Sequence, residues 1–117
     1  MPDYALVIRH KEEYWDELSP EVRDDILRRY FAWFDDLRER EVLQGAHSLH
    51  DGGRLIKIVD GKVVDGPYTE TKEIVGGFVL VRVETWDEAA AIARACPALE
   101  VGDAVELRRV SRHERPE

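Results

Sequence analysis

Hydrophobic residues recur along the chain in two patterns, one typical of β-strands and the other typical of α-helices. A short apolar run with β-branched residues occupies residues 4–8 and has the length of a strand, and residues 54–59 and 105–110 are also expected to form strands. The run 76–83 is almost continuously hydrophobic, which is expected of a central strand covered on both faces. These runs predict a sheet whose strands are spread over the whole chain.

Capping residues between these runs indicate two helices. Ser19-Pro20-Glu21 combines an N-cap hydroxyl, a proline in the first helical position and an acid near the positive end of the helix dipole. The helix that follows should end near Arg40-Glu41. Thr85 and Glu88 have the spacing of a capping box, and Pro97 should stop the second helix.

The first helix is rich in aromatic residues, which leaves two interpretations open. Its apolar side chains recur at helical spacing, so one face is expected to be buried. Aromatic residues line ligand pockets, yet a helix packed on a sheet carries the same residues. The apolar set comprises Val22, Ile26, Tyr30, Trp33, Phe34 and Leu37.

His47 lies in a segment, residues 43–50, that is predicted to form a further strand. Period two places His47 on one face with Leu43 and Leu49, and places His50 on the other face. A zinc site needs rings that converge on one ion, so this spacing predicts no metal site. A histidine among leucines is either hydrogen-bonded in a core or interface, or faces a cleft as an acid/base group. Both interpretations stay open.

Asp65 begins the most informative stretch of the chain. Asp60-Gly61 is a strong signal for a tight hairpin, whose second strand, residues 62–64, runs directly into Asp65. Asp65-Gly66-Pro67 then predicts a turn in which the glycine supplies a permissive φ. The Asp65 carboxylate is therefore expected at the end of a strand, where it is a candidate partner for His47.

The run after this turn is longer than a plain connection between strands requires. Tyr68, Glu70, Lys72 and Glu73 supply an aromatic ring and a cluster of opposite charges, so they are candidate ligand-binding residues. In the alternative interpretation, Asp65 caps its own turn, and Glu70 with Lys72 forms a surface ion pair. No motif for a cofactor stands out, so none is expected.

Composition narrows the class of protein. The formal net charge of −8 over 117 residues argues against direct binding of nucleic acid, which requires clustered basic residues. No apolar run approaches the roughly 20 residues that span a bilayer, and the start lacks the basic region of a secretory signal. The single cysteine, Cys96, agrees with a reducing compartment, and its place at a helix end predicts a buried thiol. We therefore expect a cytoplasmic protein with no membrane or nucleic-acid partner.

The order of the elements predicts the fold class. A strand, a helix, a strand, a hairpin, a strand, a helix and a last strand make an α+β sandwich of the ferredoxin-like βαββαβ type with an extra hairpin. We expect a single domain over residues 1–117, with residues 111–117 as a frayed tail. Both helices would lie on one face of the sheet and leave apolar residues on the other. A second copy packed on that face would avoid a large wet apolar patch, so the sequence predicts a homodimer.

The run Asp65-Gly66-Pro67-Tyr68, with the segment 70–73 and Gly76-Gly77-Phe78, resembles the signature of the YCII-related superfamily. More narrowly, it resembles the DGPF branch, named for its Asp-Gly-Pro-Phe motif, with Tyr68 in place of the phenylalanine. The resemblance implies a dimeric α+β barrel of ferredoxin-like subunits. It also implies a family whose activities are largely unassigned. Some members are fused to or encoded near sigma factors, and one relative is a dehydrochlorinase acting on a chlorinated aromatic diol-type substrate.

The chain departs from the founding branch of that superfamily at one point. There, a histidine in the first helix belongs to a His/Asp pair, and this sequence offers Tyr30 or Trp33 instead. The resemblance therefore carries over the segment from Asp65 to Glu73, but not the helical histidine.

Two hypotheses of function remain open. In the first, the protein is an acid/base enzyme (a lyase, isomerase or dehydrochlorinase-like protein) acting on a small cyclic or aromatic ligand in a dimer cleft, with His47 as the base and Asp65 as its partner. In the second, it is a non-catalytic module that binds a small molecule, or that binds a basic protein such as a sigma factor through its acidic surface. The absence of a complete nucleophile–base pair in the sequence favours the second.

Overall fold

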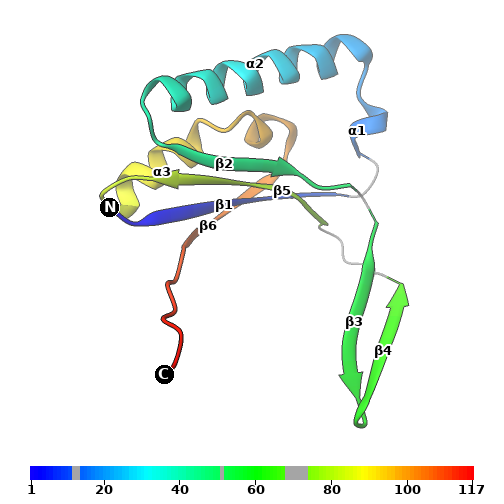
Figure 1. The fold of residues 1–117 in the computed structure, drawn as a ribbon. Coiled ribbons are helices and arrows are strands. Elements are labelled where there is room, and N and C mark those ends of the chain that lie inside the picture. The colour runs from blue at the N-terminus through cyan, green and yellow to red at the C-terminus, as the bar shows by residue number, and fades with distance from the viewer. Residues whose placement is uncertain (12–13, 51, 68–73) are drawn as a thin grey trace.

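The structure is a computed structural model that describes residues 1–11, 14–50, 52–67 and 74–117. Strands and helices follow one another in the predicted order, with the short helices α1 and η1 in addition (Figure 1). The strands are β1 (Asp3–His10), β2 (Leu43–Ser48), β3 (Arg54–Val59), β4 (Lys62–Pro67), β5 (Ile74–Arg82) and β6 (Ala104–Arg109). The helices are α1 (Tyr14–Glu17), α2 (Pro20–Glu39), α3 (Trp86–Arg94) and the 3-10 helix η1 (Pro97–Val101).

Four of the strands form one antiparallel sheet in the order β2-β5-β1-β6. β1 pairs with β5 and β6, and β5 pairs with β2. The helices α2, α3 and η1 lie together on one side of this sheet, and in the described part of the chain no helix covers the other side (Figure 1). This mixed α+β arrangement is consistent with the predicted ferredoxin-like fold.

The hydrophobic core fills the space between the sheet and the helices. The Trp33 indole N–H donates to the Ile92 carbonyl at 3.3 Å and thereby joins α2 to α3 inside the core. Trp33 is therefore a core residue, whereas Phe31 on the outer side of α2 is 62% exposed. Cys96 is buried as predicted, and burial raises the pKa of its thiol. The other large or central members of the core are Tyr4, Leu6, Leu37, Val79, Val81, Val83, Ala89 and Ala98.

Both long helices begin where their capping residues predict. The Ser19 hydroxyl accepts a hydrogen bond from the Val22 N–H at 3.2 Å, and the Thr85 hydroxyl accepts one from the Glu88 N–H at 3.1 Å. α2 ends at Glu39, close to its predicted end. Within the described ranges, no helix is both long enough and apolar enough to cross a membrane.

β3 and β4 form a separate two-stranded sheet, which projects from the four-stranded sheet on the side away from the helices (Figure 1). At its tip, Asp60 and Gly61 have φ angles of 50° and 78°. Two successive left-handed residues are typical of the I′ turn that the Asp-Gly dipeptide predicts. The predicted tight hairpin is therefore confirmed.

The turn predicted at Asp65-Gly66-Pro67 is wrong. β4 continues through Pro67, with Asp65 opposite Ile56 and Gly66 opposite Leu55. Pairing with β3 keeps this segment extended, and Gly66 is not among the glycines with positive φ. Glycine and proline are typical of turns, but both are also tolerated near the end of an edge strand. The sequence alone therefore does not show whether strand pairing stops before Gly66 or continues through Pro67.

Candidate functional site

His47 and Leu43 lie on opposite faces of the sheet, although counting by twos placed them on the same face. A register shift between Leu43 and Gly45 marks a β-bulge in β2. The extra residue reverses the alternation, so Leu43 and Ala46 both pack toward the core, whereas His47 pairs with Phe78 of β5. The prediction that His47 shares a face with Leu43 is therefore wrong, because counting by twos takes no account of a bulge.

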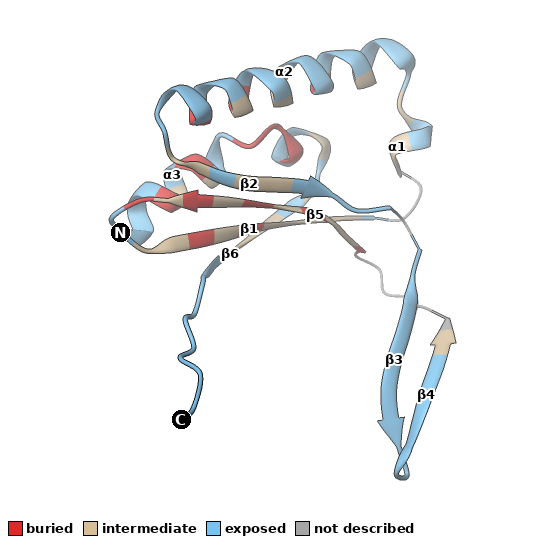
Figure 2. Ribbon diagram, viewed as in Figure 1, coloured by how far each residue is buried: buried red, intermediate tan, exposed pale blue. Residues whose placement is uncertain are grey.

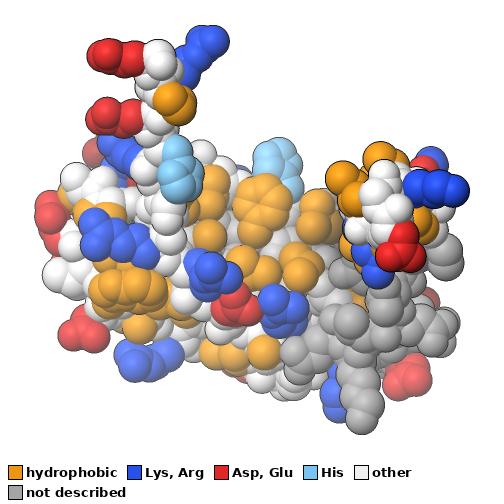
Figure 3. Space-filling view, turned by 90° about the horizontal axis from the view of Figure 1, so that it is seen from below, with side chains coloured by type: hydrophobic (Ala, Val, Ile, Leu, Met, Phe, Trp, Pro, Cys, Tyr) orange, Lys and Arg blue, Asp and Glu red, His pale blue; other side chains and the backbone are white. Residues whose placement is uncertain are grey.

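We call the side of the four-stranded sheet away from the helices the open face. Ala5 pairs with Leu80 and Val7 pairs with Phe78, so these four side chains lie next to one another on it. Each is only half-buried, whereas the residues that alternate with them are buried beneath the helices. Figure 3 views the molecule from this side and shows hydrophobic side chains gathered between the C-terminal tail and the hairpin.

The His47 ring lies beside the Phe78 ring on the open face. The ring centroids are 5.6 Å apart and the planes make an angle of 54°. His47 is exposed to solvent, and its strand β2 is at the edge of the sheet. The arrangement offers a flat apolar surface with one proton-transfer group at its margin, which suits a planar ligand.

Asp65 is paired with Arg54 of the same hairpin. The Arg54 Nε donates to one carboxylate oxygen at 3.1 Å and an Arg54 Nη donates to the other. This bidentate hydrogen bonding raises the pKa of Arg54. Among the described residues, no hydrogen bond joins Asp65 to His47, and the two lie in different sheets. Within one chain, the structure therefore does not bring the predicted pair together.

All four predicted ligand-binding residues lie outside the described residues: Tyr68, Glu70, Lys72 and Glu73. Their roles stay predictions. In the part of the chain that is described, no group of three or more histidine, cysteine, aspartate or glutamate side chains is placed to hold a metal ion.

Two adjacent glycines of β5 fix the surroundings of two histidines, which sequence patterns did not reveal. A Cβ on Gly76 would lie 2.3 Å from the His10 ring, and a Cβ on Gly77 would lie 2.7 Å from the His47 carbonyl oxygen. His10 Nδ1 is 2.8 Å from the Lys11 carbonyl oxygen, within hydrogen-bonding distance. The one sequence feature from which this could have been inferred is the Gly-Gly pair inside a strand, because glycine there often marks close approach of another group.

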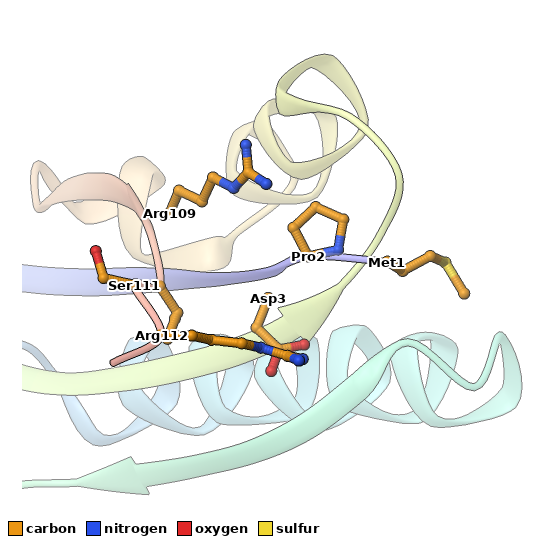
Figure 4. Close-up of a pocket in the computed structure, with 7 residues that line it drawn as sticks. Met1, Pro2, Asp3, Arg109, Ser111 and Arg112 are labelled. Carbon is orange, nitrogen blue, oxygen red and sulfur yellow. The ribbon is translucent and has the colours of Figure 1, made fainter. Parts of the chain in front are cut away.

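A hollow of about 670 Å³ lies where β1 begins and β6 ends (Figure 4). Asp3, Arg109 and Arg112 give it a charged lining. Neither His47 nor Asp65 belongs to this lining, so the hollow is separate from the predicted site.

Comparison with known proteins supports the fold and the family. A model of the YCII-related domain matches residues 3–114. None of the curated proteins matches the sequence. Among solved structures, the chain is similar to 5-chloro-2-hydroxyhydroquinone dehydrochlorinase (TftG) from Burkholderia phenoliruptrix AC1100 in complex with 2,5-dihydroxybenzoquinone. The TM-score is 0.53 at 18% identity, over 97% of this chain and 96% of that chain, so the likeness shows the fold alone.

Proposed function

The chain belongs to the YCII-related domain family, and on this premise we propose that it is an acid/base enzyme for a small cyclic or aromatic molecule bound at the open face. The observation that carries the proposal is the exposed His47 ring beside Phe78, 5.6 Å away between centroids, on an apolar surface. A planar ring stacks favourably on such a surface. Histidine is the residue type best suited to take and return a proton near neutral pH.

Loss of hydrogen chloride is the reaction class that we propose. The solved relative is, by its name, a dehydrochlorinase of a chlorinated hydroxyhydroquinone. In the corresponding step here, the substrate first shifts to its keto tautomer, in which the chlorine is on an sp³ carbon. His47 then takes a proton from a ring hydroxyl, the electrons of the O–H bond form a C=O bond, the ring double bond shifts, and chloride leaves with the electron pair of the C–Cl bond. Atoms and electrons balance without an oxidant or a reductant.

Asp65 and the residues that follow it would bind the polar groups of the ligand. We propose that the chain belongs to the DGPF branch, with Tyr68 in place of the phenylalanine. The Asp65 carboxylate is held by Arg54, so we assign it to ligand positioning together with that guanidinium rather than to direct contact with His47. We also assign Glu70, Lys72 and Glu73 to ligand binding, because they are charged and belong to the motif that begins at Asp65.

Chloride release tests the proposal directly. Purified protein is incubated anaerobically with 5-chloro-2-hydroxyhydroquinone, and free chloride is measured by ion chromatography. We expect His47→Gln to slow the release by about 10²- to 10⁴-fold, the usual contribution of a proton-transfer group. His113→Gln makes the same chemical change in the exposed tail and should leave the rate unchanged. Equal rates for the wild type and His47→Gln would overturn the assignment of His47.

A second candidate function is ligand binding without catalysis, including a regulatory role beside a sigma factor. The pairing of Asp65 with Arg54 favours it, because among the described residues no carboxylate is hydrogen-bonded to His47. Calorimetry with 2,5-dihydroxybenzoquinone separates the two functions. Binding that is equally tight in the wild type and in His47→Gln, without chloride release from the chlorinated compound, would support the binding module.

A further inference from the structure

One row of paired residues crosses the open face from β6 to β2. Glu106 of β6 pairs with Val7 of β1, Val7 pairs with Phe78 of β5, and Phe78 pairs with His47 of β2. Directly paired residues of antiparallel strands point to the same side of a sheet. The row therefore has an apolar centre, with the Glu106 carboxylate at one end and the His47 ring at the other.

The apolar centre of the row is a floor that the helices do not cover. Buried residues alternate with half-buried ones along β5 (Figure 2). Phe78 is one of the half-buried residues, and so is Val7 beside it on β1. Figure 3 shows a histidine on one side of the apolar patch and a group of basic and acidic side chains on the other.

Two arginines share the Glu106 carboxylate. Nε and one Nη of Arg9 lie 3.0 Å and 2.9 Å from one carboxylate oxygen, and an Nη of Arg108 lies 3.2 Å from the other. The hydrogen bonds from Arg108 and Arg9 hold the pKa of Glu106 below its ordinary value, so this carboxylate is charged at neutral pH. Two guanidinium groups thus face one carboxylate, which leaves one positive charge in excess.

This excess of positive charge is accessible to a ligand. The side chains of Arg9 and Arg108 are 34% and 70% exposed. A guanidinium group carries more N–H donors than either arginine uses on Glu106, and the remaining donors can bind an oxygen anion. The chain as a whole has a formal net charge of −8, so a positive group beside an apolar floor is a specific feature of this face.

The distance across the floor suits a single aromatic ring. Phe78, next to His47, is two strand spacings from Glu106, or roughly 10 Å between main chains. An aromatic ring with oxygens at two opposite positions has a similar length once a hydrogen bond of about 2.8 Å is added at each end. One end of such a ring would face His47 while the other end faces the two arginines.

We propose that Arg9 and Arg108 bind an ionised oxygen of the ring ligand, so that the site selects planar one-ring molecules that are negatively charged opposite the position facing His47. The placement of the ring on the open face rests on the proposed function. Glu106 holds the two guanidinium groups in place. A neutral ring would cover the same apolar floor but would forgo the charge-assisted hydrogen bonds.

Titration calorimetry with two quinones of the same ring tests this selection. The ring hydroxyls of 2,5-dihydroxybenzoquinone are acidic and are ionised at neutral pH, whereas 2,5-dimethoxybenzoquinone has no acidic hydrogen. We expect the wild type to bind the anion at least about tenfold more tightly than the neutral quinone. Added salt should weaken binding of the anion and leave binding of the neutral quinone unchanged.

Arginine variants locate the charge that makes the difference. Arg9→Gln and Arg108→Gln should each lower the affinity for the anion by about tenfold and leave the affinity for the neutral quinone unchanged. Arg109→Gln is the matched control, because Arg109 is the next residue of β6 and pairs with Tyr4, which is buried beneath the helices. Circular dichroism of the three variants checks that the fold is retained.

Several outcomes would overturn the proposed selection: a wild type that binds both quinones equally or binds neither, wild-type affinity for the anion in Arg9→Gln and Arg108→Gln, or an equal loss in Arg109→Gln. Chloride release tests the catalytic proposal separately. Arginine-dependent binding of the anion without chloride release would support the selection and refute catalysis. Chloride release that needs His47 but has the same rate and KM in both arginine variants would do the reverse.

Discussion

His47 and Phe78 occupy directly paired positions of β2 and β5, and their rings lie 5.6 Å apart at 54° on the open face. The pair exists because a bulge between Leu43 and Gly45 turns the second half of β2 over. The open face consequently carries a proton-transfer group next to an aromatic ring. Neither residue alone would distinguish this surface from an ordinary half-covered sheet.

If a planar ligand stacks at this point, Phe78→Ala should weaken its binding. Aromatic contacts contribute about 0.5–1.5 kcal/mol beyond the area that they bury, so we expect a loss of affinity for 2,5-dihydroxybenzoquinone of up to roughly tenfold. Phe78→Leu keeps an apolar side chain but loses the ring, and it should give most of the same loss. Titration calorimetry measures both. Affinity unchanged in Phe78→Ala would place the ligand elsewhere.

Gly77 and Gly45 should respond in opposite ways to alanine. A Cβ on Gly77 would lie 2.7 Å from the His47 carbonyl oxygen, so β2 would have to shift as a strand. We expect Gly77→Ala to lower the free energy of unfolding by about 1–3 kcal/mol, as overpacking typically does. A Cβ on Gly45 meets nothing within 4 Å, so Gly45→Ala should be neutral or stabilise by about 0.5–1 kcal/mol.

Urea denaturation of both glycine variants provides the measurement. Gly77→Ala should also lower the proposed chloride-releasing activity, because a shift of the His47 backbone carbonyl would move the His47 ring as well. Equal stability of Gly77→Ala and Gly45→Ala would show that β2 accommodates the added methyl group without cost.

The Arg54–Asp65 pair should matter little to stability. The two side chains are 74% and 40% exposed, and exposed ion pairs typically contribute about 0–1 kcal/mol. We expect Asp65→Asn to lower the free energy of unfolding by less than about 1 kcal/mol, and by less still at high salt. A double-mutant cycle with Arg54→Gln measures the coupling. A loss well above this range would mean that the pair stabilises the β3–β4 hairpin more than an exposed ion pair normally does.

Local signals in the sequence predicted most of the fold. Ser19 and Thr85 cap α2 and α3 through hydrogen bonds that involve residues three positions away, and Asp60-Gly61 forms its turn from two residues alone. Such features depend only on residues that are close together in the sequence, so a single sequence is enough to predict them.

The candidate site was predicted less well, because its geometry depends on pairing between distant strands. The face that His47 occupies is set by the bulge in β2 opposite Leu80 and Val81. Asp65 lies close enough to Arg54 to bind it only when β3 and β4 pair in the observed register. Counting back from the Asp60-Gly61 turn would have placed Arg54 diagonally from Asp65. No comparable count finds the bulge.

Acid should destabilise the protein through carboxylates on the open face. The hydrogen bond from Arg82 holds the pKa of Asp3 below its ordinary value, and hydrogen bonds from Arg108 and Arg9 do the same for Glu106. A carboxyl group whose pKa is lower in the folded than in the unfolded chain stabilises the fold above its unfolded pKa. That contribution is lost as the pH falls through the folded pKa. Stability should therefore be flat near neutral pH and should decline below about pH 4.

Thermal unfolding at a fixed protein concentration, followed from neutral pH downward, measures this decline. Asp3→Asn should flatten part of the acid slope, since the group no longer titrates. Arg82→Gln should flatten it to a similar extent, because Asp3 then loses the hydrogen bond that depresses its pKa. The double variant should add little to either change. An acid slope that is identical in the wild type and in Asp3→Asn would show that other carboxylates govern the transition.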